Sequence, residues 1–170
     1  MRKWVFFIES SEICLCPECG GLLKYRDKVP RIQKQIGGEK QIYMINRMKC
    51  SNVACGKLHR QLTDRMVKFK HFAAQVIEDV IDEVISEEDG LDHPCDGTMM
   101  QWRLWFARNM MQMEGYMRSV GHRLCGFFEG FLKPAESLLT EIRERINPGW
   151  LGIVCRIVNN SGGALLTGPL

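Results

Sequence analysis

Two short stretches decide the fold: Cys16-Pro17-Glu18-Cys19-Gly20-Gly21 and Cys50-Ser51-Asn52-Val53-Ala54-Cys55-Gly56-Lys57. Each offers two thiolates from one tight turn, and a strand-rich segment separates them. Zn²⁺ prefers four soft ligands in a tetrahedron, with Zn–S bonds of about 2.3 Å. A glycine ends each pair, where a metal-binding turn often needs a positive φ that glycine adopts without a Cβ clash. The spacing predicts one structural zinc ion, bound by Cys16, Cys19, Cys50 and Cys55.

The choice of ligands leaves an alternative open. Cys14 and Cys19 repeat the four-residue gap of the second pair, so Cys14 could replace Cys16 as a ligand. We expect Cys16, because Cys-Pro-x-Cys-Gly is the more specific metal-binding turn. His59 is a weaker spare ligand, and we expect it on a strand or at the surface.

Disulfides are the competing interpretation of paired cysteines, and they require an oxidising compartment. The apolar run Trp4–Ile8, which follows Met1-Arg2-Lys3, is too short for the apolar region of a signal peptide or for a membrane span. We therefore expect a cytoplasmic protein with reduced thiols and no membrane association.

The charge is distributed unevenly along the 170 residues. The whole chain has a formal net charge of +3, but residues 1–72 hold 15 Lys and Arg against 6 Asp and Glu, a charge of +9. Residues 73–170 hold 8 against 14, a charge of −6. A basic half beside an acidic half favours a polyanion-binding surface on the first half.

The residues around the cysteines are typical of short strands. The run at residues 4–8 is rich in aromatic and β-branched residues and predicts a buried strand. Val29-Pro30 predicts an interruption, and Gly37-Gly38 predicts a hairpin turn. Together they predict a basic β zinc ribbon over residues 1–65. The expected strands cover residues 4–8, 22–27, 31–36, 41–49 and 58–62.

Basic residues interleaved with aromatic ones decorate this predicted sheet. Such a surface suits contact with phosphates and some stacking of bases, so DNA is the expected partner. Phosphate contacts would fix position, whereas sequence would be read elsewhere. The candidate phosphate contacts are Lys24, Arg26, Arg47, Lys49 and Arg60.

A helix is predicted over residues 73–87, because its apolar residues follow the i, i+3, i+4 rule. The opposite face is acidic and is expected to be solvated, so this helix should support the fold without touching phosphates. The apolar stripe consists of Ala73, Val76, Ile77, Val80, Ile81, Val84 and Ile85, and the acidic face of Glu78, Asp79, Asp82, Glu83 and Glu87.

A second long helix is predicted over residues 98–120, capped by Asp96 or Thr98. A recognition helix places its N-terminal turns in the major groove. The candidate base readers are therefore Gln101, Arg103 and Arg108. The expected apolar face consists of Met99, Trp102, Trp105, Phe106, Met110, Met113, Tyr116, Met117 and Val120, with Leu104 and Met111 on the far side.

Two shorter helices are predicted near the C-terminus, over residues 135–146 and 150–158, with Pro134 in the first turn of the former. The expected organisation is an α+β protein. It consists of a basic zinc-ribbon domain (1–65), a helical domain with a helix-turn-helix-like unit (66–160) and a flexible tail (161–170).

Several stretches carry a resemblance to a known family: Cys16-Pro17-Glu18-Cys19-Gly20-Gly21, Arg47-Met48-Lys49-Cys50, Cys55-Gly56-Lys57-Leu58-His59-Arg60, Lys68-Phe69-Lys70-His71-Phe72 and Thr98-Met99-Met100-Gln101-Trp102-Arg103-Leu104-Trp105-Phe106. They resemble an uncharacterised zinc-ribbon and helix-turn-helix family of bacterial mobile elements, related to transposase N-terminal regions. The resemblance implies a ribbon followed by a helix-turn-helix and implies DNA binding. This chain departs from the family in its longer second cysteine turn and its acidic first helix.

Recombinase chemistry does not fit the sequence. A two-metal strand-transfer site needs carboxylates from separate elements of a sizeable α/β core, whereas the acidic residues here crowd into residues 78–96 and 129–144. The chain also has no phosphate-binding glycine loop and no Ser/His/Asp arrangement. We therefore expect neither an enzyme nor a small-molecule substrate.

Two functions remain. The first is a zinc-dependent DNA-binding accessory or regulatory protein of a mobile element or phage. The alternative is a non-enzymatic inhibitor or adaptor that binds a protein, for example a nucleic-acid-processing defence nuclease. It would act through the acidic helix 73–87 and the Met- and Trp-rich helix 98–120.

Overall fold

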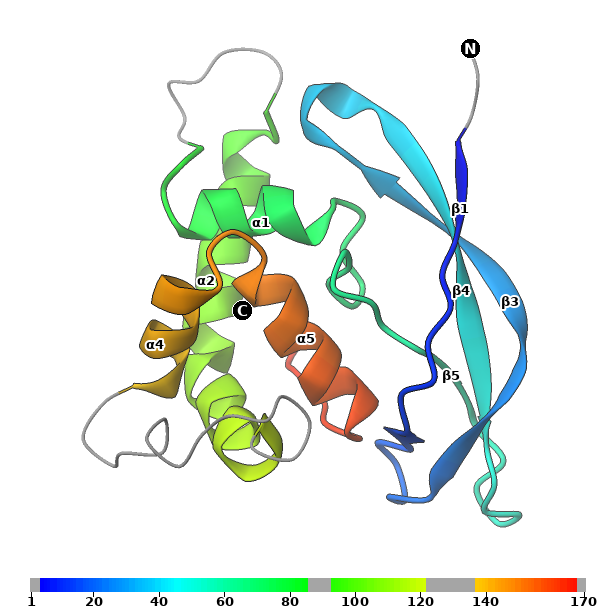
Figure 1. The fold of residues 1–170 in the computed structure, drawn as a ribbon. Helices are drawn as coiled ribbons and strands as arrows, with labels where there is room; N and C mark the ends of the chain where they lie inside the picture. Colours follow the sequence, from blue (N-terminus) through cyan, green and yellow to red (C-terminus); the bar gives the residue numbers. More distant parts are fainter. Residues whose placement is uncertain (1–3, 86–92, 122–136, 168–170) are drawn as a thin grey trace.

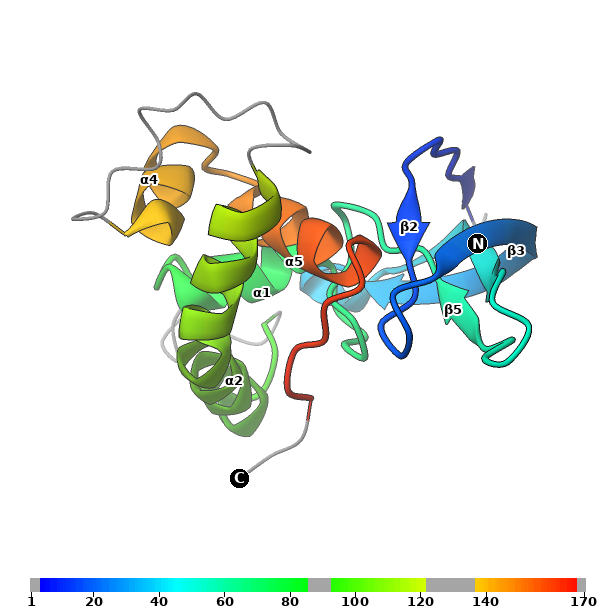
Figure 2. The ribbon, with the colours of Figure 1, turned by 90° about the horizontal axis from the view of Figure 1, so that it is seen from below.

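The fold places a β-sheet on one side and a layer of helices on the other (Figure 1). The computed structural model describes residues 4–85, 93–121 and 137–167. The earlier part of the chain forms the strands, and the later part forms the helices that pack beside them. A view from below separates the two layers clearly (Figure 2). The predicted α+β class is therefore confirmed.

A long antiparallel hairpin forms the centre of the sheet. It pairs β3 (Leu22–Lys34) with β4 (Lys40–Cys50). The connection holds a short 3-10 turn, Ile36–Gly38, in which Gly37 and Gly38 have φ values of 77° and 76°. Glycine adopts such angles without strain, so the predicted Gly-Gly hairpin is confirmed.

The β3 strand continues through Pro30, so the predicted interruption at Val29-Pro30 is wrong. Pro30 lies opposite Met44 in the register of the hairpin. In the described part of the chain, β2 (Cys14–Leu15) pairs with the outer edge of β3 only at the start of that strand. Pro30 thus lies in a stretch with a strand on one side only, which is where sheets tolerate proline.

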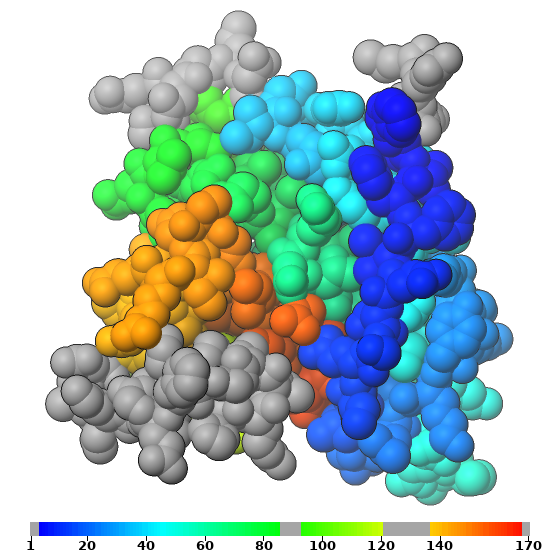
Figure 3. All heavy atoms as spheres, in the orientation of Figure 1, coloured from blue at the N-terminus to red at the C-terminus, as the bar shows by residue number. Residues whose placement is uncertain are grey.

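Two further strands flank β4 on its other edge. β1 (Val5–Phe7) runs parallel to it, and β5 (Leu58–Arg60) runs antiparallel to it. The sequence predicted a buried strand at residues 4–8, but β1 is exposed, and Phe7 keeps 68% of its surface in solvent. The reason is its position at the edge of the sheet, where the space-filling view shows it on the molecular surface (Figure 3).

Four α-helices are described, and each coincides with a predicted one. The predicted helix 135–146 begins later, after the N-cap Ser137, which accepts a hydrogen bond from the Thr140 N–H. Pro134 lies outside the described residues. The second helix starts after Cys95, and its last turn passes into a π-helical turn, Met117–Gly121. The bounds are Ala74–Ile81 for α1, Asp96–Tyr116 for α2, Leu138–Arg145 for α4 and Trp150–Asn160 for α5.

The first helix is shorter than predicted. It ends at Ile81, because Glu83 adopts a left-handed conformation with φ 59° that no helix can contain. Val84 therefore leaves the apolar stripe and is 68% exposed, whereas Val80 is fully buried as predicted. Glu87, which was expected on the acidic face, lies outside the described residues.

The sequence predicted a solvated acidic face on α1, but two of its carboxylates point into the fold. Glu78 is buried, and its carboxylate accepts hydrogen bonds from the Gly149 and Leu151 N–H groups at 2.6 and 2.8 Å. Asp82 accepts from the Trp150 indole at 2.8 Å and pairs with Arg143. The first N–H groups of a helix lack partners within the helix, and a carboxylate satisfies them best. The two acids therefore hold the start of α5.

One apolar core joins the sheet to the helices. Tyr43 and Ile45 of β4 belong to the same buried cluster as the apolar side chains of the helices, so the core crosses from the ribbon half into the helical half. On α2, Met110 is exposed, although the sequence predicted it on the apolar face, and the neighbouring Asn109 is buried. None of the described helices is both long and apolar enough to cross a membrane. The predicted face of α2 otherwise buries Met99, Trp102, Trp105, Phe106, Met113 and Met117.

The segment 161–167 is held along α2, although the sequence predicted a flexible tail. The Leu166 N–H donates to Asn109 Oδ1 at 2.8 Å, and the Leu166 carbonyl accepts from the Trp105 indole at 2.9 Å. Gln112 donates to the Ala164 carbonyl at 2.7 Å. These bonds explain why a polar residue, Asn109, lies in the core: its amide satisfies the backbone of this segment.

Candidate metal centre and basic face

The first cysteine turn lies between β2 and β3. Its backbone closes through two bonds of 2.8 Å, from the Cys16 N–H to the Gly21 carbonyl and from the Gly20 N–H to the Cys16 carbonyl. Gly20 has a φ of 70°, as predicted for the residue that follows the second cysteine. This closed turn brings the side chains of Cys16 and Cys19 to the same side.

The second turn connects β4 to β5, and the longer gap between its cysteines is absorbed around Asn52. The Asn52 carbonyl accepts from the N–H groups of Cys55 at 3.0 Å and Gly56 at 2.9 Å. The Cys50 N–H donates to the Lys57 carbonyl at 2.9 Å and closes the turn at its base. Gly56 has a φ of 56°, which matches the prediction for this turn as well.

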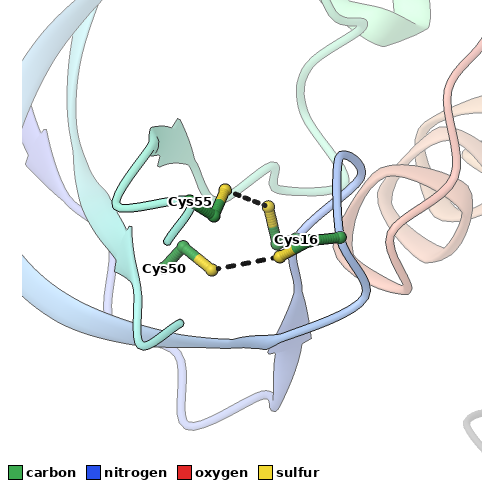
Figure 4. Close-up of side chains that lie close together, drawn as sticks. Cys16, Cys50 and Cys55 are labelled. Atoms are coloured by element: carbon green, nitrogen blue, oxygen red, sulfur yellow. Dashed lines mark hydrogen bonds between the residues drawn. The ribbon is translucent and has the colours of Figure 1, made fainter. Parts of the chain in front are cut away.

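The two turns bring four sulfur atoms together. The Sγ atoms of Cys16, Cys19, Cys50 and Cys55 all lie within 4.8 Å of one another, and Figure 4 shows the labelled thiols converging. Two of the separations are 3.8 Å, between Cys16 and Cys55, and 3.5 Å, between Cys19 and Cys50. A tetrahedral thiolate site with metal–sulfur bonds of about 2.3 Å has edges of about 3.8 Å between sulfurs. The cluster could therefore hold a metal ion.

A second glycine of the first turn packs against the sulfurs, and the sequence reasoning did not assign it a role. A Cβ on Gly21 would lie 3.2 Å from Cys50 Sγ and 3.4 Å from Cys19 Sγ. Any larger residue would therefore push against the cluster. The Gly-Gly pair at residues 20–21 was the available signal, because only one of these glycines is needed for the positive φ.

The thiols of the cluster differ in how readily they ionise. A backbone hydrogen bond from Gly21 and one from the Cys50 side chain lower the pKa of Cys19 to about 7. Burial raises the pKa of Cys50 to about 12. Four adjacent thiolates repel one another, and a bound divalent cation supplies the charge that allows all of them to deprotonate.

The neighbouring candidates Cys14 and His59 lie outside the cluster. Cys14 is buried on β2, its thiol donates to the Glu12 carbonyl at 3.6 Å, and burial raises its pKa to about 11. Cys16 therefore occupies the position in the cluster that Cys14 could have taken. His59 Nε2 lies 3.3 Å from Cys16 Sγ, close enough to donate a hydrogen bond to that sulfur.

Four of the five predicted phosphate contacts share one face of the sheet. Lys24 lies directly opposite Lys49, and Arg47 lies directly opposite Arg60. Paired residues share a face, and residues two apart on a strand do so as well, so Arg47 and Lys49 join the two pairs. We call this set, which consists of Lys24, Arg47, Lys49 and Arg60, the basic face.

The fifth candidate, Arg26, lies at an irregularity of β3, where the register shifts between Tyr25 and Asp27. Asp27 modifies the charge at this point. Its carboxylate pairs with Arg47 and lies 3.7 Å from Arg26 Nε. The hydrogen bond from Arg47 keeps the pKa of Asp27 below its usual value. Arg47 is therefore partly neutralised, whereas Lys24, Lys49 and Arg60 are exposed.

The three candidate base readers lie on α2, in the helical layer away from the basic face (Figure 1). Gln101 and Arg108 are exposed. Arg103 is half-buried, and its Nε donates to the Val80 carbonyl at 3.4 Å, so it ties α2 to α1. Their role in reading bases stays a prediction. The helix-turn-helix-like unit also stays a prediction, because residues 86–92 of the connection between α1 and α2 lie outside the described residues.

Comparison with known families assigns the first part of the chain to a family. Residues 16–102, which contain all four clustered cysteines and the basic face, match a family described as a domain of unknown function (DUF6431). No curated protein matches the chain, and no solved structure matches it.

Proposed function

The chain belongs to the DUF6431 family, and from that premise we propose that it is a zinc-stabilised DNA-binding protein. It binds duplex DNA through the basic face and acts as an accessory or regulatory factor for the DNA of a mobile element or phage. The resemblance of its cysteine stretches to transposase N-terminal regions supports the biological setting. The geometry of the sheet supports the ligand.

The observation that carries the proposal is the pairing of like charges. Lys24 opposite Lys49 and Arg47 opposite Arg60 are two adjacent pairs of cations on one face. Like charges directly opposite each other destabilise a sheet. An external polyanion relieves that repulsion, because each phosphate neutralises a cation and releases condensed counterions. The carboxylate of Asp27 pairs with Arg47 and, at longer range, with Arg26.

Zinc supports this face structurally. The cluster joins the turn before β3 to the turn between β4 and β5, which are the strands that carry the four cations. A structural zinc site contributes binding energy on the order of 10 kcal/mol to the folding of small domains. The proposed ion would therefore keep the three strands in the register that places the cations side by side.

The metal is tested with one ligand variant and one matched control. Cys50→Ser should lower the bound zinc in natively purified protein well below one ion per chain and loosen the sheet. Cys14→Ala removes a buried thiol that lies outside the cluster, so it should keep the metal. Elemental analysis with far-UV circular dichroism measures both effects. Wild-type protein without zinc would exclude the proposed ion, and loss of zinc from the Cys14 variant would show that the ligands are assigned wrongly.

DNA binding is tested by the dependence of affinity on salt. The double variant Lys24→Ala/Lys49→Ala should weaken binding to all duplexes equally and flatten the salt slope by about 2. The control is Lys34→Ala/Lys40→Ala, which removes two lysines that also lie opposite each other, but on the other face and at the far end of the hairpin. Equal losses from both double variants would leave the basic face without a special role.

An adaptor function has one observation in its favour. Met100, Leu104 and Met111 are exposed along α2, and Met111 keeps 85% of its surface in solvent. Spacings of four and seven residues place them on one side of the helix, as expected for a surface that a partner covers. The acidic part of that interface is reduced, because Glu78 and Asp82 point into the fold. Failure to bind any duplex at low salt, together with binding to a basic nuclease, would favour this function.

A further inference from the structure

A cavity of about 500 Å³ opens between the sheet and α5. Its walls come from β2, β3, β4 and β5, from the first cysteine turn, from the segment between β5 and α1, and from the end of α5. The view from below shows α5 across from β2 and β5 (Figure 2). The volume lies within the range of roughly 300–1,000 Å³ that is usual for sites of small ligands. It exceeds what a single phosphate group fills.

The charged groups around this cavity are mostly cationic. Arg31, Arg60 and Lys68 line it, and in the described part of the chain none of them lies within 4.0 Å of a carboxylate oxygen. The acidic side chain that lines it, Glu18, is occupied by Lys57 at 3.0 Å. The full set of ionisable groups in the lining, thiols aside, is Glu18, Arg31, Arg47, His59, Arg60 and Lys68.

Arg31 is fixed beside the cavity, and burial disfavours the charges of Arg31 and Lys68. Arg31 Nη2 donates to the Lys70 carbonyl at 2.8 Å, which fixes its guanidinium beside the cavity. Burial lowers the pKa of Arg31, and the nearby charge of Arg60 lowers it further. Burial also lowers the pKa of Lys68. A bound anion would offset this penalty, because it adds negative charge beside Arg31 and Lys68, whereas the carboxylate of the lining, Glu18, is already paired with Lys57.

The rim of the cavity carries an aromatic ring. Phe69 is 64% exposed, and it has a φ of 62°, which is an unfavourable conformation for a bulky residue. Lys68 Nζ lies 5.4 Å from the centre of its ring. Strained residues of this kind concentrate at ligand sites. An exposed ring beside a basic groove is the arrangement on which the bases of single strands stack.

We propose that this cavity binds one unpaired nucleotide of a DNA strand, with its phosphate near Arg31 and Lys68 and its base on Phe69. Arg47 and Arg60 of the basic face border the cavity, so the two sites are adjacent. A paired base is held in its duplex and cannot enter a concave site, so the ligand of the cavity differs from the duplex that lies on the basic face. The inference rests on the proposed function only for the choice of DNA as the polymer. The protein would then engage both a duplex and a strand that leaves it, as at a DNA end or junction.

The test compares two probes on the zinc-loaded full chain. One is a fluorescein-labelled single-stranded octathymidylate, and the other is a labelled duplex, both measured by fluorescence anisotropy. Phe69→Ala should weaken binding of the single strand about 5-fold to 150-fold, since stacking contributes about 1–3 kcal/mol per base, and should leave duplex binding unchanged. Phe69→Leu keeps an apolar side chain without the stacking ring and should weaken binding similarly. Thermal melts establish that both variants are folded.

Competition measurements distinguish a nucleotide site from a site for any phosphate anion. Thymidine monophosphate should displace the single strand from the wild type and less well from Lys68→Ala, whereas inorganic phosphate at equal ionic strength should displace it poorly. Equal displacement by both would overturn the nucleotide site and leave a simple anion site. If the affinity for the single strand is unchanged by Phe69→Ala, the inference is refuted, even if the duplex binds through Lys24 and Lys49. If the protein binds the single strand in a way that depends on Phe69 but binds no duplex, the proposed function is refuted and the nucleotide site in the cavity stands.

Discussion

The contact between α5 and the segment after β5 can be tested with Gly152→Ala. A Cβ built on Gly152 would overlap the carbonyl oxygen of Asp64 and lie 2.7 Å from its carbonyl carbon and 3.2 Å from its Cα. These are backbone atoms, which cannot rotate away as the end of a flexible side chain can. Either α5 or the segment at Asp64 must therefore move.

The expected cost follows from the local geometry. Forcing an extra carbon into a packed site usually costs about 1–3 kcal/mol, and movement of α5 also disturbs the bond of 2.9 Å from the Leu62 N–H to Asn160 Oδ1 and the ion pair between Arg156 and Asp64. Replacing glycine by alanine within a helix stabilises the helix by about 1 kcal/mol, which offsets part of this cost. We expect a net loss of about 2 kcal/mol, which lowers the Tm by about 4–8 °C at this chain length.

The matched control is Gly115→Ala, which makes the same chemical change in α2. A Cβ there meets nothing within 4 Å, so the variant should gain up to about 1 kcal/mol from helix propensity. Thermal unfolding of the zinc-loaded proteins, followed by far-UV circular dichroism, measures both. A Tm for Gly152→Ala equal to or above that of the wild type would show that α5 does not lie against Asp64, and the account of this interface would fail.

Two further predictions concern the polar groups that the core buries. Glu78→Ala leaves the N–H groups of Gly149 and Leu151 without an acceptor and should lower the free energy of unfolding by about 2–4 kcal/mol. The control Gln75→Ala, on the exposed side of α1, should lower it by less than about 0.5 kcal/mol. Urea unfolding curves that coincide for the two variants would contradict the capping of α5. Asn109→Ala should release the segment around residue 166, seen as faster C-terminal trimming by carboxypeptidase, and unchanged trimming would show that this segment is held by other contacts.

The local features of this protein were predictable from its sequence. The cysteine turns depend on ligand type, short spacing and a glycine with positive φ, all of which lie within a few residues, and the structure brings the four expected sulfurs together. The Gly-Gly hairpin is likewise local. The helices were recognised because the apolar period of a helix is set by its own geometry.

The role of a polar residue depended instead on partners that are distant in the chain. Glu78 and Asp82 looked like a solvated acidic face, and only the start of α5, about seventy residues later, supplies the donors that draw them inward. Asn109 is buried for the same reason, because the segment near Leu166 needs an acceptor and a donor in the core. The periodic spacing of apolar residues along a helix does not reveal such hydrogen-bond partners from distant parts of the chain.

The surfaces that matter for function were also decided by tertiary structure. The sequence identified the cations of the sheet, but the register determined that Lys24 faces Lys49 and that Arg47 faces Arg60. The cavity is assembled from strands, a connecting segment and a helix that are far apart in the chain. Residue types and their spacing determine which ligands a segment can offer, whereas packing determines which groups meet and which remain available to a partner.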